Sequence, residues 1–274
     1  MSQNRLFAAS KPSGVTCSRF LSQIKKKYSV KKAGYSGTLD PFAEGVLIVA
    51  FGQYTKLFRF LDKTPKKYEA TLWLGAKSET LDIERVESVD EVTPFEMEEL
   101  RFAASKLKGT LTYRPPKFSA KKIDGKRSYE LAREGRDVEL KEITTEVYEL
   151  LITGYEHPFV TFEATVSEGG YIRSIGKMMA ELLGVEGCLK QLRRLNEGAF
   201  FYDDEKALDP LRLLNIKENV YTGDKEDIML GRVLKKEDFI LQEQGEYFIK
   251  TDDFLSVLKI DESVEYLLNK IELC

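Results

Sequence analysis

The sequence is poor in the residues that build metal centres and disulfide frameworks. Its 274 residues include one histidine, His157, and three widely spaced cysteines, Cys17, Cys188 and Cys274, with no C-x-x-C pair. This pattern argues against a structural zinc site and a disulfide framework, and it fits a reducing, cytoplasmic compartment. With so little histidine and cysteine, we expect no metal and no cofactor.

Long apolar runs are missing too. No run approaches the ~18 residues of a membrane span, and no N-terminal charged-then-apolar segment indicates export. We therefore expect no membrane association. At 42% hydrophobic residues the chain can bury a full core, as one large domain or as one domain with a small appendage.

The chain has no overall positive charge, since its formal net charge is −3. The charge is unevenly distributed, however. Residues 1–60 carry 10 Lys/Arg against 2 Asp/Glu and residues 101–136 carry 11 against 3, whereas residues 61–100 carry 5 against 11 and residues 212–274 carry 9 against 14. Because phosphate binding depends on local potential, the two basic blocks are compatible with an RNA partner. Solvated faces of ordinary helices are the alternative.

The most informative stretch that is present covers residues 34–47. It contains three glycines, Pro41 and a single aspartate, Asp40, and it leads into the apolar run 46–51. Glycine allows backbone conformations that a Cβ forbids, and proline fixes φ. The pattern predicts a carboxylate on a tightly bent loop, followed at once by a buried strand.

Other interpretations of this stretch fit less well. A phosphate-binding loop of the Walker type needs Gly-Lys-Ser/Thr, and Gly45 is followed by Val46. Ser36 does not lie in a G-x-S-x-G elbow, and a serine nucleophile usually needs a histidine. On composition alone, an ordinary turn with a surface aspartate stays open.

The sequence Gly37-Thr38-Leu39-Asp40-Pro41, with Gly45-Val46-Leu47 after it, resembles the catalytic motif of the TruB family of pseudouridine synthases, which modify the T-loop uridine of tRNA. The resemblance implies that Asp40 is the catalytic residue. The family usually has a histidine where this chain has Tyr35, so Tyr35 is an altered candidate for RNA contact. Lys11, in a Lys-Pro-x-Gly sequence, resembles the family motif that braces the catalytic loop and is a second substrate-side candidate.

Two further motifs supply the other expected site residues. Lys-x-Tyr before a strand that ends in Leu-Gly is similar to the family's second motif and implies that Tyr68 stacks on the uracil. Residues 167–174 resemble Ser-x-Gly-Thr-Tyr-Ile-Arg-Ser, which implies that Arg173 pairs with Asp40 and that Tyr171 lines the uracil pocket. We expect the arginine to lower the pKa of Asp40 by roughly 1–3 units. The sequence Ser78-Glu79-Thr80-Leu81-Asp82 departs from the family pattern, and we assign it no role beyond a loop.

Later motifs extend the resemblance. Residues 112–136, with Pro115-Pro116 and many cations, match the insertion that grips the RNA stem-loop in the family. Leu-Arg-Arg at 192–194, followed by Gly198 and Phe200, implies that Leu192 packs on the base. The phosphate-facing candidates of the insertion are Lys117, Lys121, Lys122, Lys126, Arg127 and Arg133.

We predict an α+β fold of the pseudouridine-synthase type, with a mixed, mainly antiparallel sheet, flanking helices and an RNA-binding cleft. The catalytic domain spans 1–214, and 215–274 form a reduced appendage that resembles the PUA module. Periodicity predicts the strands 6–9, 46–51, 67–75, 138–152, 159–166 and 245–250, and helices that begin after Thr16 and over 96–107, 172–183 and 262–271.

The resemblance implies a cofactor-free, aspartate-dependent isomerisation of uridine 55 in the tRNA T-stem-loop, with the base flipped out, by a protein that we expect to be a cytoplasmic monomer. Whether Asp40 adds to C6, attacks C1′ or removes the 2′ proton stays open. Two alternatives also stay open: a non-catalytic RNA-binding or tRNA-folding module, and a synthase that acts on another RNA.

Overall fold

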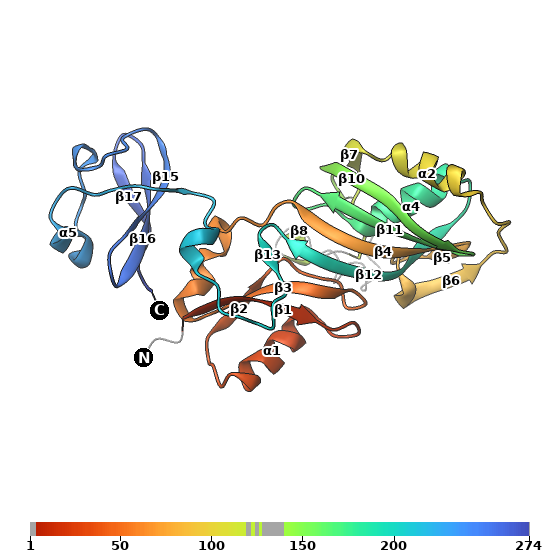
Figure 1. The fold of residues 1–274 in the computed structure, drawn as a ribbon, viewed down its shortest axis with the longest axis horizontal. Helices are drawn as coiled ribbons and strands as arrows, with labels where there is room; N and C mark the ends of the chain where they lie inside the picture. The colour runs from red at the N-terminus through yellow and green to blue at the C-terminus, as the bar shows by residue number, and fades with distance from the viewer. Residues whose placement is uncertain (1–3, 119–121, 124–125, 128–139, 274) are drawn as a thin grey trace.

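The computed structural model describes residues 4–118, 122–123, 126–127 and 140–273. Within these residues the main feature is one large sheet with the strand order β1-β3-β12-β4-β11-β10-β7 (Figure 1). Two further strands extend it: β2 pairs with β3, and β13 pairs with β12. Its strands are β1 (Arg5–Lys11), β2 (Ala33–Ser36), β3 (Glu44–Phe51), β4 (Lys66–Leu74), β7 (Gly109–Tyr113), β10 (Ile143–Glu156), β11 (Phe159–Val166), β12 (Gly187–Glu197) and β13 (Phe200–Phe201). Its pairs are antiparallel apart from β12 with β3, which confirms the predicted mixed, mainly antiparallel sheet.

In the part of the chain that the structure describes, three longer helices accompany this sheet: α1 (Cys17–Lys27), α2 (Met97–Ser105) and α4 (Ile172–Leu182). They confirm the predicted helices after Thr16, over 96–107 and over 172–183, within a few residues at the ends. The shorter elements around the sheet are the hairpin β5 (Ala76–Ser78) with β6 (Val86–Val89), the hairpin β8 (Lys122–Ile123) with β9 (Lys126–Arg127), and the 3-10 helices η1 (Gly52–Phe60), η2 (Ile83–Arg85) and η3 (Pro210–Leu213).

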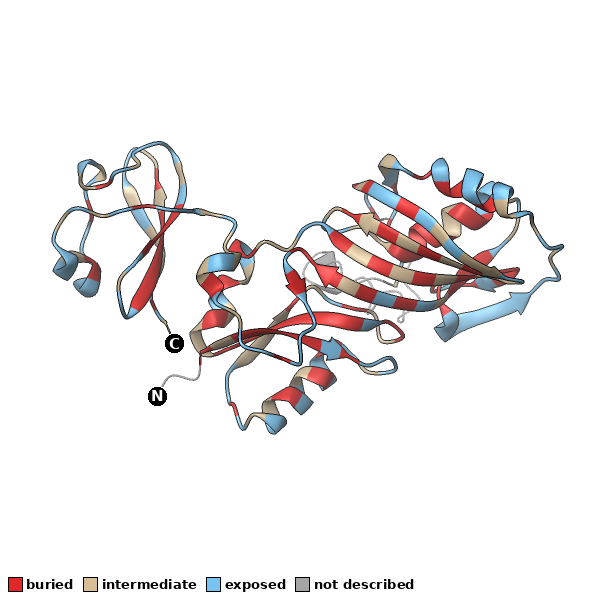
Figure 2. Cartoon of the chain, in the orientation of Figure 1, coloured by how far each residue is buried: buried red, intermediate tan, exposed pale blue. Residues whose placement is uncertain are grey.

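The sheet is buried on both faces at β1 and β3, and the alternation of side chains explains why. On β1, Phe7 and Ala9 belong to the core that includes buried residues of α1, α2 and α4, whereas Leu6 and Ala8 belong to a second core with η1. Strands β4 and β11, farther along the sheet, alternate buried with partly exposed residues instead (Figure 2). The apolar run at 46–51 therefore forms a buried strand, as predicted.

Helix α1 begins beside the loop that carries Asp40, and local interactions fix its start. The Thr16 side chain caps its first turn by accepting a hydrogen bond from the Arg19 amide at 3.2 Å. Phe20 and Ile24 lie one turn apart and are buried against the sheet. The run Lys25–Lys27 occupies the last turn, where cations favour the negative end of the helix dipole.

The C-terminal region forms a separate four-stranded sheet, β14 (Lys217–Glu218), β15 (Gly245–Lys250), β16 (Phe254–Ile260) and β17 (Val264–Glu272), beside α5 (Lys225–Leu230) and η4 (Lys236–Asp238). The predicted helix over 262–271 is therefore wrong. Its leucines and glutamates have good helix propensity, but pairing with β16 overrides it, because as a strand it packs on two cores: Tyr266 on one and Leu268 and Ile271 on the other.

This small sheet is packed onto the large one. Phe248, Leu255, Val257 and Ile271 share one buried cluster with residues of β1, β3 and η1. The boundary that we predict near residue 214 thus separates two sheets that share a core; its interpretation as a PUA-like module stays a prediction. Within the described residues, no helix is long and apolar enough to span a membrane.

The shared core predicts coupled unfolding. We expect Leu255→Ala, at a fully buried position of the small sheet, to lower the free energy of unfolding by about 2–5 kcal/mol, because it removes buried methyl groups and leaves a cavity. The single tryptophan, Trp73, lies on β4 of the large sheet and reports on that sheet.

Denaturant unfolding followed by Trp73 fluorescence measures this effect. The control is Val233→Ala, whose residue in the same C-terminal region is 90% exposed and which should leave the midpoint unchanged. An unchanged Trp73 transition in Leu255→Ala would contradict a shared core.

Candidate active site

The loop that carries Asp40 connects β2 to β3 and bends at two glycines. Gly37 has φ +71° and Gly45 has φ +104°, which L side chains rarely adopt. A Cβ at Gly37 would also collide with the Glu197 carboxylate, and one at Gly45 with the backbone of Arg194. The glycines of the motif are thus required by backbone conformation and by close packing against β12.

The inner side of the loop is held by groups from β1 and α1. The fully buried Lys11 ammonium donates to the carbonyls of Pro12 (2.9 Å), Val15 (2.7 Å) and Pro41 (3.4 Å). The Cys17 thiol accepts from the Leu39 amide at 3.2 Å and donates to the Leu39 carbonyl at 3.3 Å. The backbone on both sides of Asp40 is therefore fixed from within.

Our interpretation of Lys11 as a substrate-binding residue is wrong. Its side chain has no exposed surface, and its ammonium is occupied by backbone carbonyls. Burial lowers the pKa of Lys11, while the nearby Cys17, Asp40 and Glu44 oppose that shift. Lys11 contacts the loop that bears Asp40 rather than solvent, which agrees with the bracing role that the family motif implies.

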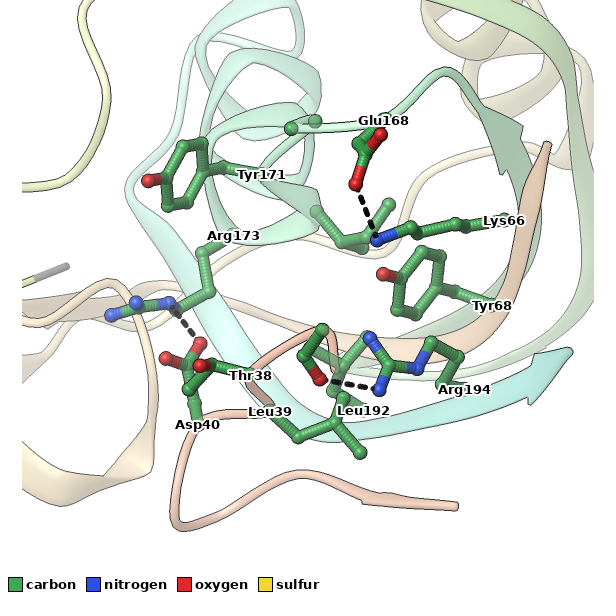
Figure 3. A pocket seen from close by; sticks show the side chains of 14 residues that line it. Thr38, Leu39, Asp40, Lys66, Tyr68, Glu168, Tyr171, Arg173, Leu192 and Arg194 are labelled. Carbon is green, nitrogen blue, oxygen red and sulfur yellow. Dashed lines mark hydrogen bonds and ion pairs between the residues drawn. The ribbon is translucent and has the colours of Figure 1, made fainter. Parts of the chain in front are cut away.

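A cavity of about 240 Å³ opens above this loop (Figure 3). It is smaller than the ~300–1,000 Å³ of sites for drug-sized ligands, which favours a small group such as one base. Its wall combines the loop, β4, the start of α4 and β12. The lining residues are Gly37, Thr38, Leu39, Asp40, Lys66, Tyr68, Glu168, Gly169, Gly170, Tyr171, Ile172, Arg173, Leu192 and Arg194.

Arg173, in the first turn of α4, makes the central contacts. Its Nε lies 2.9 Å from Asp40 Oδ2 in an ion pair (Figure 3), and its side chain is only 3% exposed. Its Nη1 donates to the Thr80 carbonyl at 2.7 Å and to Asp82 Oδ2 at 3.2 Å, and its Nη2 donates to the Phe118 carbonyl at 2.8 Å. One guanidinium therefore binds three segments that are far apart in the sequence.

Thr80 and Asp82 correct our interpretation of residues 78–82 as a loop without a role. Both side chains are buried, and Asp82 Oδ1 accepts from the Thr80 hydroxyl at 2.6 Å and from the Glu84 amide at 3.0 Å. Asp82 is thus oriented toward Arg173. The signal was present in the sequence, because Thr80 and Asp82 are the two positions at which this segment agrees with Thr-Asp-Thr-x-Asp.

The expected lowering of the pKa of Asp40 is also wrong. Burial raises the pKa of Asp40 above its ordinary value of 3.8; Arg173 opposes this rise, and the like charge of Asp82 adds to it. The Asp40 side chain is still 31% exposed. Even so, its partial removal from water raises the pKa more than the ion pair with Arg173 lowers it. The site therefore holds a carboxylate that protonates more readily than an ordinary aspartate.

The structure brings the other predicted pocket residues to the same cavity. Tyr68 on β4 is buried and lies between Lys66 and Arg194, and Leu192 on β12 is buried beside it (Figure 3). Tyr171, directly before α4, is half-buried, and its amide donates to the Tyr113 hydroxyl at 2.9 Å. Two strands, one loop and one helix start thus contribute to a single wall.

Tyr35 lies outside this cavity, on β2, with its hydroxyl 3.5 Å from Ser18 Oγ. Among the cations of the insertion, Lys117 is exposed. The backbones of Lys122, Lys126 and Arg127 form the hairpin β8–β9, and Lys121 and Arg133 lie outside the described residues. No group of three or more His, Cys, Asp or Glu side chains in the described part of the chain could hold a metal ion.

Comparison with known proteins gives matches over most of the chain. A model described as TruB family pseudouridylate synthase (N terminal domain) matches residues 25–172. The chain is 53% identical to a tRNA pseudouridine synthase B of Sulfurovum sp. (strain NBC37-1), over 98% of this chain and 97% of that one. It is 50% identical to a tRNA pseudouridine synthase B of Campylobacter curvus (strain 525.92), over 99% and 100%. A chain of a Cbf5-Nop10-Gar1 complex has a similar fold, with a TM-score of 0.68, 20% identity, and coverage of 98% and 84%.

The charges around Arg173 allow a prediction of how the pKa of Asp40 changes when Asp82 is neutralised. We expect Asp82→Asn to lower the pKa of Asp40, because it removes a like charge and leaves the guanidinium to Asp40. Carboxyl ¹³C NMR titration measures the shift. In the control Glu44→Gln, an exposed carboxylate four positions from Asp40 is neutralised, and the pKa of Asp40 should not move. A rise in Asp82→Asn would contradict this electrostatic arrangement.

Proposed function

Since the chain belongs to the TruB family of pseudouridylate synthases, we propose that the cavity around Asp40 converts the T-loop uridine of tRNA, position 55, to pseudouridine. The chain is a tRNA pseudouridine synthase, an isomerase. The observation that carries the proposal is the ion pair of Asp40 with Arg173, on the wall of a cavity that also contains Tyr68, Tyr171 and Leu192.

The reaction is balanced within the nucleotide. The C1′–N1 bond breaks, the detached uracil turns, C5 bonds to C1′, and the proton on C5 is replaced by one on N1. No oxidant, reductant or second substrate is needed. Asp40 acts in its ionised form on the ribose or the base, by addition at C6, by attack at C1′ or by removal of the 2′ proton.

Arg173 holds the carboxylate of Asp40 toward the cavity. Its two terminal nitrogens bind Asp82 and the carbonyls of Thr80 and Phe118, so the guanidinium has little freedom to turn away. Asp82 is a positioning residue in this proposal, because it contacts Arg173 and acts on Asp40 only through it.

Tyr68 stacks on the uracil and can take the proton from C5, while Tyr171 and Leu192 close the sides of the base site. A uridine must leave its stack to reach this cavity, which costs a few kcal/mol and less in a loop than in a stem. The aromatic and aliphatic side chains replace the lost stacking.

The RNA backbone contacts in this proposal come from the insertion, with Lys117, Lys121 and Arg133 facing phosphates of the T-stem-loop. Tyr35, on β2 and outside the cavity lining, is the remaining RNA-side candidate. The protein acts as a cytoplasmic monomer without cofactor or metal. The two alternatives, a non-catalytic tRNA-binding module and a synthase for another RNA, differ from it in product and in modified position.

The first test is Asp40→Asn. We expect this variant to bind unmodified tRNA like the wild type and to form no pseudouridine, because an amide cannot act as a carboxylate nucleophile or base. The measurement pairs a binding titration with mapping of pseudouridine in the product. Asp203→Asn, an exposed aspartate, is the matched control and should convert normally.

Wild-type protein that binds tRNA without converting it would favour the non-catalytic module. Conversion at a position outside the T-loop would favour the other RNA substrate. An active Asp40→Asn would show that the roles are assigned wrongly.

The second test is the pH dependence. Because the pKa of Asp40 is raised, its protonated, inactive form extends to higher pH than for an ordinary aspartate, so kcat/KM should fall on acidification with an apparent pKa above 3.8. Initial rates at subsaturating tRNA measure it, with circular dichroism to confirm that the protein stays folded. An acid limb at or below 3.8 would contradict the raised pKa.

A further inference from the structure

A second arginine, Arg194 on β12, lies against the other side of the loop that carries Asp40. Its Nη2 donates to the Gly37 carbonyl at 2.7 Å and its Nε donates to the Val46 carbonyl at 2.8 Å. Gly37 precedes Asp40 and Val46 follows it, so a single guanidinium joins both ends of the loop. Arg194 is 1% exposed and lies on the wall of the cavity (Figure 3).

This guanidinium is held by a buried carboxylate. Glu197 has no exposed surface; its Oε2 lies 3.1 Å from Arg194 Nη2 and its Oε1 lies 3.1 Å from Lys66 Nζ. Lys66 is on β4, two residues before Tyr68 on the same face of the strand. The cluster of Arg194, Glu197 and Lys66 therefore connects β12, β4 and the loop beneath the base site.

The cluster also fits the conformation of the loop. The Glu197 carboxylate packs against Gly37, where any side chain would collide with it. Arg194 pairs with Gly45 in the parallel register of β12 and β3, and a Cβ at Gly45 would collide with its backbone. Both glycines also have positive φ, so the close packing of the loop against this cluster requires a backbone conformation that other residues rarely adopt.

A buried ion cluster is not an efficient way to stabilise a fold, because desolvation of the charges can exceed their mutual attraction. The contacts of Arg194 with two carbonyls at fixed separation require a planar fork with several donors, which lysine lacks. The guanidinium of Arg194 is therefore better suited to fixing the backbone of the Asp40 loop than to stabilising the fold as a whole.

We propose that Arg194 is a positioning residue for the reaction: Arg173 sets the direction of the Asp40 side chain, and Arg194, oriented by Glu197 and Lys66, sets the backbone from which that side chain projects. The proposal rests on the function assigned to the Asp40 cavity. It predicts a loss in the chemical step without a loss in tRNA binding.

The experiment compares Arg194→Lys with Arg193→Lys. Arg193 is the adjacent arginine, but it is exposed and its nearest ion-pair contact, with Glu44, is 3.9 Å, so its replacement should change nothing. Lysine at 194 keeps the charge and can bind only one of the two carbonyls well. We expect the single-turnover rate at saturating tRNA to fall about 10²-fold, as for a misplacement of about 1 Å, with an unchanged Kd for tRNA.

The possible results are separable. A wild-type rate in folded Arg194→Lys overturns the proposal, and so does a weaker Kd whose effect disappears at saturating tRNA, because Arg194 would then bind substrate. If thermal unfolding shows that Arg194→Lys is not folded at the assay temperature, Glu197→Gln decides: a slower rate with an unchanged Kd supports the proposal, and a wild-type rate overturns it.

Loss of folded protein in both variants also overturns the proposal, since it would assign the cluster to global stability. Failure of the proposed function has a different signature: the wild-type protein itself would then form no pseudouridine in the T-loop. With an active wild type and an inactive Asp40→Asn, any failure belongs to the role of Arg194 alone.

Discussion

The geometry of the cavity depends on one buried guanidinium that has four acceptors from three segments. Arg173 reaches Asp40 from the loop after β2, Asp82 and the Thr80 carbonyl from the turn after β5, and the Phe118 carbonyl from the start of the insertion. Loss of one partner of a buried charge pair typically costs about 3–5 kcal/mol. The segments are therefore fixed relative to one another by charge as well as by packing.

The same charge arrangement explains why the pKa of Asp40 rises beside an arginine. Burial of Asp40 is the largest cause of this rise; Arg173 opposes it, and the like charge of Asp82, on the same guanidinium, adds to it. A carboxylate that is less well stabilised in the resting site gives up less interaction energy when it bonds or transfers a proton, and such a ground state suits a reactive group.

Prediction from sequence succeeded where a residue type and its neighbours specify a local structure. The glycines and Pro41 around Asp40, the alternation of β4 and β11, and the capped helix α1 are all local patterns. It failed where contacts across elements decide. The local pattern of residues 262–271 predicts a helix, but the segment pairs with β16 as a strand. The sequence around Lys11 suggests a cation that is free to bind substrate, but in the fold three backbone carbonyls accept from it.

For Asp82 and Arg194 prediction from sequence is partial: each belongs to a recognisable motif, but the sequence does not show which residue it contacts. Asp82 meets Arg173 from 91 residues away and Arg194 meets Gly37 from 157 residues away, and no periodicity in the sequence encodes such pairs. What links them is the sheet: β12 runs between β3 and β4, so its side chains contact both the Asp40 loop and the Tyr68 strand. The order of strands, more than any one motif, brings Arg194 to the backbone of the loop whose aspartate pairs with Arg173 of α4. A loop held only by its own turns would tolerate more than one conformation, whereas a loop held at its backbone and at its carboxylate by separate cations has one.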